Sequence, residues 1–135
     1  IAELENEGPD CQRLQDLRVT AEKSRDAVYA GDFPALGQAM IENTAAQGRL
    51  HPDLISRDAQ QVIEIAKSYG VLGWKVNGAG GEGGSITLLC PALSYTRREL
   101  LRAIEAANPL YKHIPIYLSR YGLRIWEQEP HNGGC

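Results

Sequence analysis

Hydrophobic residues recur at intervals of three and four in three segments of the first half of the chain, residues 10–30, 32–48 and 56–69. The repeated positions are, in order, Leu14, Leu17, Ala21 and Val28; Leu36, Ala39, Met40 and Asn43; and Ala59, Val62, Ile63 and Ala66. Residues at this spacing lie on one face of an α-helix. The pattern therefore predicts three helices, each with one face turned toward a common core.

Residues that favour helix ends stand at the borders of these segments. Asp32 is placed to cap the second helix, and Pro34 falls in its first turn, where the missing N–H does no harm. Gly31 and Gly70 follow the first and third helices, and glycine is common just after a helix. We therefore expect the first and third helices to end directly before these glycines.

Helical spacing changes to strict alternation in residues 72–90. One side of this segment would carry Trp74 and Val76, and the other side would carry Lys75 and Asn77. After a run of glycines the alternation returns at Ile86, Thr87, Leu88, Leu89 and Cys90. Alternation at a period of two is typical of half-buried strands. The segment therefore predicts two short strands joined by a glycine-rich loop.

The last third of the chain predicts a fourth helix and a second pair of strands. Thr96 and Glu99 have the spacing of a capping box, which would open a helix at Thr96. The residues of this helix that would face inward are Leu100, Leu101 and Ile104. A final hairpin, with its turn near Gly122, is predicted by the alternation of Ile114, Ile116 and Leu118, followed by Leu123 and Ile125. Pro115 would place the first of these strands at a sheet edge.

The predicted order is three helices, two strands, one helix and two strands. Such an order favours an α+β domain of two layers, with helices packed on a mostly antiparallel sheet in a ferredoxin-like sandwich. A chain of 135 residues suits one domain, which we expect to occupy residues 10–128. Residues 1–9 would form an acidic linker or frayed segment, and residues 129–135 a flexible, glycine-rich tail.

The loop between the first two strands contains five glycines within residues 78–84. Glycine loses more backbone entropy on folding than any other residue, so such a cluster indicates a geometric need. Either several positions require positive φ, or a ligand approaches the bare backbone closely. Successive backbone N–H groups in such a loop form a concavity that binds anions. A simple hairpin tip is the alternative, but it needs only a two-residue turn.

The same glycines formally satisfy the G-x-G-x-x-G pattern, beginning at Gly78. The dinucleotide-binding form of this pattern requires a helix after the loop, whereas Ser-Ile-Thr-Leu-Leu predicts a strand. The phosphate loop of the Walker type is excluded as well, because no Gly-Lys-Ser/Thr follows. The segment is therefore a strand–loop–strand unit whose backbone N–H groups are suited to bind phosphate.

Composition narrows the function classes. A net charge of −3 argues against nucleic acid as a partner, and no apolar run has the length of a membrane-spanning helix. Cys11, Cys90 and Cys135 are scattered and show no C-x-x-C spacing, which disfavours zinc and a disulfide framework. We therefore expect a protein of the reducing cytoplasm, with no metal site.

Four segments together resemble the C-terminal half of the GHMP kinases, a superfamily that includes galactokinase, homoserine kinase, mevalonate kinase and phosphomevalonate kinase. They are residues 31–37 (GDFPALG), 50–56 (LHPDLIS), 66–70 (AKSYG) and 73–84 (GWKVNGAGGEGG). The resemblance covers residues 14–126. The Ile114-Pro115 strand and the turn at residues 122–124 most resemble the sugar-kinase branch, such as heptose-phosphate kinases and fucokinase-like enzymes.

The resemblance implies transfer of phosphate from ATP, with Mg²⁺, to a small sugar or sugar phosphate. It also implies that the glycine-rich loop borders the phosphate and the substrate, and the loop residues are Gly78, Ala79, Gly80, Gly81, Gly83 and Gly84. Glu82 departs from the pattern: either it replaces the glycine that the family usually has there, or it is a one-residue insertion. We expect its carboxylate to face solvent rather than to hold Mg²⁺. The ATP-binding motif Pro-x-x-x-Gly-Leu-x-Ser-Ser is not present in these residues. An N-terminal kinase domain would supply it, so this chain alone should neither turn over nor bind ATP tightly.

Lys75 and Asn77 are the two side chains beside the loop that are candidates for contact with phosphate or substrate. Lys75 would either reach an anion or lie on a solvated face, and Asn77 is better suited to brace the loop by hydrogen bonds. Two other functions fit the same sequence. The chain would be a ligand-binding module without catalysis, or an interaction domain that pairs through an open sheet edge.

Overall fold

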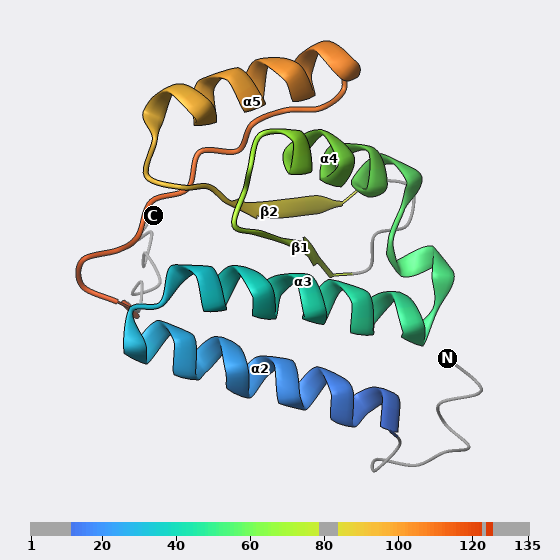
Figure 1. The fold of residues 1–135 in the computed structure, drawn as a ribbon, viewed down its shortest axis with the longest axis vertical. Helices are drawn as coiled ribbons and strands as arrows, with labels where there is room; N and C mark the ends of the chain where they lie inside the picture. Colours follow the sequence, from blue (N-terminus) through green and yellow to red (C-terminus); the bar gives the residue numbers. More distant parts are fainter. Residues whose placement is uncertain (1–11, 79–83, 123, 126–135) are drawn as a thin grey trace, which may run out of the picture.

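The computed structural model describes residues 12–78, 84–122, 124 and 125. Within these residues the elements follow one another as shown in Figure 1. They are α2 (Gln12–Ala30), α3 (Phe33–Leu50), a short 3₁₀ helix η1 (Pro52–Leu54), α4 (Arg57–Ser68), β1 (Gly73–Asn77), β2 (Ser85–Leu89) and α5 (Ser94–Ala107). The α+β class and the antiparallel pairing predicted from the sequence are confirmed.

The helix borders follow from local capping. Asp32 accepts a hydrogen bond from the Ala35 backbone N–H at 2.9 Å and so caps α3 as predicted. Ser56 caps α4 in the same way, accepting from the Ala59 N–H at 3.1 Å. Gly70 follows Tyr69, the C-cap residue of α4, so the helix stops before this glycine as predicted, and its φ of +64° is the left-handed conformation common after a helix.

Helices α2 and α3 form an antiparallel pair whose seam is built from small and polar residues. Thr20 and Ala27 are the buried residues of α2, and Asn43 of α3 donates to the Thr20 hydroxyl at 2.7 Å. The predicted stripe of α2 is therefore wrong in its second half, because Ala21 is exposed and Val28 is 62% exposed. Thr20 and Ala27 each lie one position before the predicted Ala21 and Val28, so the buried face is rotated by one position from the predicted one.

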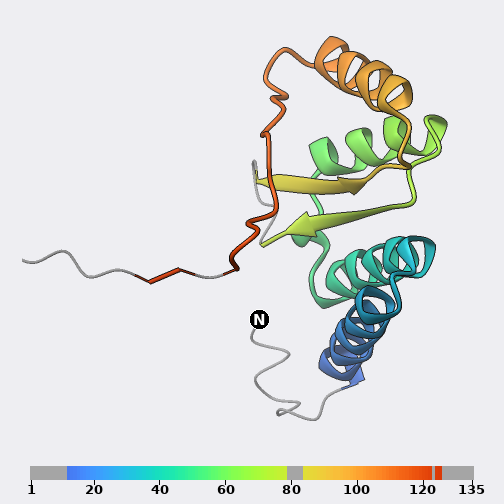
Figure 2. The ribbon, with the colours of Figure 1, turned by 90° about the vertical axis from the view of Figure 1, so that its left-hand side faces the viewer.

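The sheet lies between the α2–α3 pair and α5, and both views show this arrangement (Figures 1 and 2). Strands β1 and β2 pair antiparallel with Gly73 opposite Leu89 and Asn77 opposite Ser85. Helix α3 packs on β1, while α4 contacts both β2 and α5. The core contains Val62, Ile63, Ala66, Val76 and Leu100, among others, which confirms the predicted inward faces of α4 and α5.

Two predictions for the last third of the chain are wrong. Helix α5 begins at Ser94 rather than Thr96, and its N-cap residue, Leu93, makes no side-chain cap hydrogen bond. The first strand of the predicted final hairpin is not formed either, because residues 108–122 contain no strand; Leu123 of the second predicted strand lies outside the described residues. Ile116 and Leu118 are 76% and 103% exposed. Alternation alone does not make a strand, because strand side chains are stabilised by packing on an apolar surface, and these side chains are exposed.

Candidate functional site

The candidate site is the junction where β1 ends and the glycine-rich segment begins. Gly78 has φ of +67° and Gly84 has φ of +107°, so both glycines adopt conformations that L side chains rarely take. Positive φ, one of the two needs that the glycine cluster predicts, therefore occurs at both ends of the segment. Of the other predicted loop residues, Ala79, Gly80, Gly81 and Gly83 lie outside the described residues, as does Glu82.

Asn77 joins the two strands directly below these glycines. Its side-chain Nδ2 donates to the Ser85 hydroxyl at 3.1 Å and to the Thr87 hydroxyl at 3.0 Å. The bracing role inferred for Asn77 is therefore performed through side chains of β2 rather than through backbone groups. These bonds hold the last residue of β1 against the first part of β2.

Lys75 extends from β1 toward α3 and is half-buried. Its ammonium donates to Gln47 Oε1 at 2.7 Å and to the Val76 carbonyl oxygen. Burial lowers the pKa of Lys75 below its ordinary value, since the charged form is partly removed from water. Within the described part of the chain, no carboxylate forms an ion pair with this ammonium. The positive charge of Lys75 is therefore met there by neutral carbonyl groups.

Gln47 is the residue of this junction that the sequence analysis did not identify. It is only 9% exposed, and its Nε2 donates to the Gly78 carbonyl oxygen while its Oε1 accepts from Lys75. The signal was present, because Gln47 lies four residues after Asn43 and continues the predicted inward face of the helix. A polar residue on an inward face indicates a specific partner, which here is the end of β1.

Thr44, one helical turn before Gln47, binds the middle of the same strand. Its hydroxyl donates to the Trp74 carbonyl oxygen and accepts from the Val76 N–H, both at 3.3 Å. Helix α3 thus supplies side-chain partners to β1 along its length. Because the strand is held at several points, the position of Lys75 and Gly78 relative to α3 is well defined.

A hollow of about 450 Å³ lies beside this junction, between α3, η1, α4 and β1. Its lining is mostly apolar and includes Ile41, Ala45, Ile55, Ile63 and Trp74. Lys67 also lines the hollow, and its ammonium lies 5.5 Å from the centre of the Trp74 ring. Lys75 and Gly78 do not line this hollow, so it is separate from the junction.

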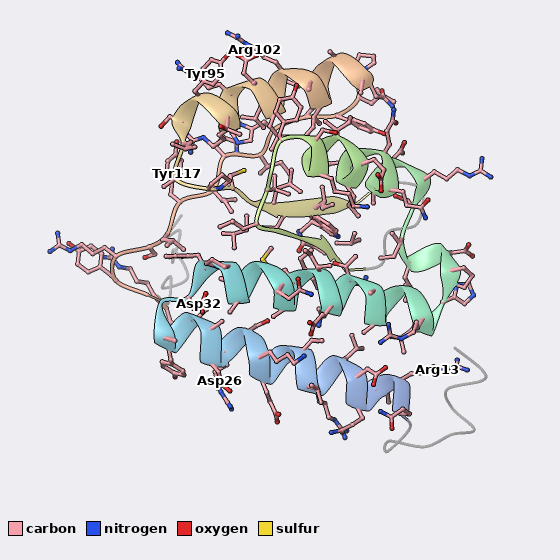
Figure 3. All side chains as sticks on the ribbon, viewed as in Figure 1. Arg13, Asp26, Asp32, Tyr95, Arg102 and Tyr117 are labelled. Atoms are coloured by element: carbon pink, nitrogen blue, oxygen red, sulfur yellow. The ribbon has the colours of Figure 1, made fainter. Side chains whose placement is uncertain are left out.

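Other charged and aromatic residues are distributed over the surface. Figure 3 shows Tyr95 and Arg102 on the outer side of α5, and Asp32 at the turn between α2 and α3. Among the described residues, no three His, Cys, Asp or Glu side chains come together in a way that would hold a metal ion. No ligand for Mg²⁺ is therefore assigned within the described ranges. None of the helices in this part of the chain has the length and apolar character needed to cross a membrane.

Comparison with known proteins agrees with this architecture. The sequence matches the family described as GHMP kinases C terminal over residues 24–109, which is more than half of the chain. A search of curated protein sequences gave no match. Among solved structures, the chain is similar to the L. major mevalonate kinase crystallised with R-mevalonate.

The structural match has a TM-score of 0.64 at 24% sequence identity, and it covers 78% of this chain. At this identity the likeness shows the fold, and the matched region spans only 32% of the mevalonate kinase chain. The family match includes the strand–glycine–strand unit, and the structural match shows that the two chains share this fold. The chain belongs to the GHMP kinase C-terminal domain family.

Proposed function

We propose that this chain is the C-terminal part of an ATP-dependent kinase that phosphorylates a hydroxyl group of a small metabolite. In this proposal the junction of Lys75 and Gly78 borders the transferred phosphate. The observation that carries the proposal is a half-buried ammonium, without a carboxylate partner among the described residues, beside the first glycine of the loop. Family membership supplies the reaction class.

The chemistry of phosphoryl transfer suits such a junction. The reaction depends mainly on positioning and on stabilising negative charge on the phosphoryl oxygens. The Lys75 ammonium has three N–H donors, and two of them are used by Gln47 and the Val76 carbonyl. The third donor and the positive charge are available to a phosphate oxygen. ATP supplies the phosphoryl group when bound, and Mg²⁺ offsets its charge.

The proposed partners and substrate go beyond the family match. We assign ATP binding to an N-terminal kinase domain that carries the Pro-x-x-x-Gly-Leu-x-Ser-Ser motif, and we expect no tight binding of ATP by this chain alone. The proposed substrate is a sugar or sugar phosphate, and the proposed location is the cytoplasm. Support for the sugar branch comes from sequence resemblance, and mevalonate, which is bound in the similar structure, is the substrate to test beside it.

The experiment compares this chain with the complete natural protein that contains it. ADP formation is measured with ATP, Mg²⁺ and a panel of sugars, sugar phosphates and mevalonate. We expect turnover by the complete protein, none by the chain alone, and a loss of about 100-fold in kcat for Lys75→Met. Lys23→Met is the matched control, because Lys23 forms a surface ion pair with Glu42 away from β1.

Two outcomes would contradict the proposal. Full activity of Lys75→Met would remove the junction from the phosphate site. A complete protein that transfers phosphate to no hydroxyl compound, together with tight binding of an anionic metabolite by the chain alone, would favour the ligand-binding module instead.

A further inference from the structure

We propose that Gln47 is a positioning residue for a phosphate site at the end of β1. Its side-chain amide holds the Lys75 ammonium and the Gly78 carbonyl in a fixed relation, so that the ammonium is presented to a phosphate group beside the loop. The inference rests on the proposed function, because it assigns a role within the same junction. It adds a residue from α3 that does not itself touch phosphate.

The side-chain amide of Gln47 has both the donor and the acceptor that its two neighbours require. An ammonium only donates hydrogen bonds and a backbone carbonyl only accepts them. The two neighbours therefore require opposite ends of the Gln47 amide, with Oε1 toward Lys75 and Nε2 toward Gly78. A carboxylate would lack the donor, and an aliphatic side chain would lack both groups. Glutamine is thus the residue of this length that satisfies both partners at once.

The absence of charge on Gln47 preserves the positive charge of Lys75. Gln47 is buried and neutral, so it orients the ammonium without cancelling its charge. A glutamate at the same position would form an ion pair with Lys75 and leave little net charge for a ligand. The arrangement therefore holds a cation in place while preserving its attraction for anions, which a purely structural ion pair would not do.

Strand β1, which carries Lys75, is held in place by hydrogen bonds on both of its sides. Gln47 lies in α3, one turn after Thr44, whose hydroxyl is bound to the Trp74 carbonyl and the Val76 N–H. On the opposite side of β1, Asn77 is tied to Ser85 and Thr87. Groups on both sides of the strand thus limit its movement, and the Gln47 amide is the link that reaches the Lys75 ammonium and the Gly78 carbonyl.

The test measures phosphate affinity of the chain by NMR titration, with inorganic phosphate and pyrophosphate as probes and the Gly78 amide signal as readout. Gln47→Met removes both hydrogen bonds at similar length, and we expect it to weaken binding about fivefold. Gln47→Glu keeps an acceptor for Lys75 but neutralises its charge, and we expect a loss of more than about tenfold. Gln38→Met, at an exposed position of the same helix, is the control and should bind as the unchanged chain does.

The order of the two variants separates positioning from support of the fold. A purely structural Gln47 predicts that Gln47→Glu is the milder change, because it retains a bond to Lys75 and gains an ion pair. A double-mutant cycle adds a second readout: in a Lys75→Met background, Gln47→Met should have no further effect on phosphate affinity. Thermal unfolding verifies that each variant folds. If one Gln47 variant does not fold, the comparison of Lys75→Met with and without Gln47→Met still tests the proposal.

Kinetics of the complete protein identify the source of the phosphate. A rise in KM for ATP in Gln47→Met indicates a nucleotide phosphate, and a rise in KM for the second substrate indicates a substrate phosphate. Either result supports the inference. Unchanged phosphate affinity in both Gln47 variants overturns it and leaves the kinase function standing, whereas absence of phosphate binding by the unchanged chain overturns the site itself. The proposed kinase function is tested separately, by measuring ADP formation by the complete protein.

Discussion

Gly37 of α3 and Gly73 of β1 meet backbone to backbone. A Cβ atom on Gly37 would overlap the Leu72 carbonyl, and one on Gly73 would overlap the Gly37 backbone. Both obstacles are main-chain atoms, which cannot rotate away as a side chain can. This contact sets the distance between α3 and β1, and with it the reach of Gln47 and Thr44 to the strand.

Gly37→Ala should therefore destabilise the domain. Separating α3 from β1 to admit one methyl group should cost about 2–3 kcal/mol in the free energy of unfolding, as overpacking of a tight contact does. Gly48→Ala in the same helix is the matched control, because its Cβ would stand 3.4 Å from Ile55 Cγ1, an ordinary contact. Its better helix propensity should add about 0.5 kcal/mol. Urea denaturation measures both values, and equal stabilities would show that the glycine contact is not required.

Thr44→Val should also destabilise, for a different reason. The substitution keeps the shape of the side chain but leaves the buried Val76 N–H without its acceptor, a loss of about 1–3 kcal/mol. Thr44→Ser retains the hydroxyl and should lose no more than about 1 kcal/mol. Chemical denaturation of the two variants separates the hydroxyl from the methyl group. If Val and Ser were equally tolerated, the hydrogen bonds to β1 would contribute nothing to stability.

Substitutions in the predicted final strand should be nearly neutral. Ile116→Ser and Leu118→Ser change exposed side chains, so we expect shifts within about 0.5 kcal/mol. Val76→Ala, at a residue only 2% exposed, should by contrast cost about 2 kcal/mol. Thermal unfolding compares the three variants. A large loss at Ile116 or Leu118 would mean that this segment is packed in solution and that the predicted hairpin forms after all.

The lowered pKa of Lys75 predicts a dependence of stability on pH. Burial reduces the folded-state pKa, while the unfolded chain keeps the ordinary value of 10.5. Between these two values the unfolded state binds more protons, so the contribution of Lys75 to stability rises with pH. The difference in unfolding free energy between the unchanged chain and Lys75→Met should therefore grow as the pH approaches 10.5 from below.

Urea denaturation at several pH values between neutrality and 10.5 measures this difference. The pKa of Tyr111 is raised above its ordinary value of 10.0 by burial and by Asp58, so above pH 10.0 its effect on stability has the opposite sign. Because Tyr111 is present in both proteins, its contribution cancels in the difference. A difference that stays constant or falls with pH would show that folding does not lower the pKa of Lys75.

Much of the candidate site was visible in the sequence. Lys75 and Asn77 were identified because they alternate with core residues and precede the glycines, and positive φ in the glycine cluster was one of two alternatives that its composition offered. Gln47 was missed, although it continues an inward helical face, because its partners lie about 30 residues further along the chain. No local pattern encodes which strand residue a helix side chain will meet.

The sequence by itself determined the features that depend on neighbours a few residues away. Asp32, Ser56 and Gly70 define helix borders through backbone groups within four positions, and alternation defines β1 and β2. Tertiary structure alone decided the features that depend on distant atoms: the face that α2 buries, the contact of Gly37 with Gly73, and the partners of Gln47. It also decided that residues 114–118 form no strand, because alternating side chains stabilise a strand only where they pack on an apolar surface, and these side chains are exposed.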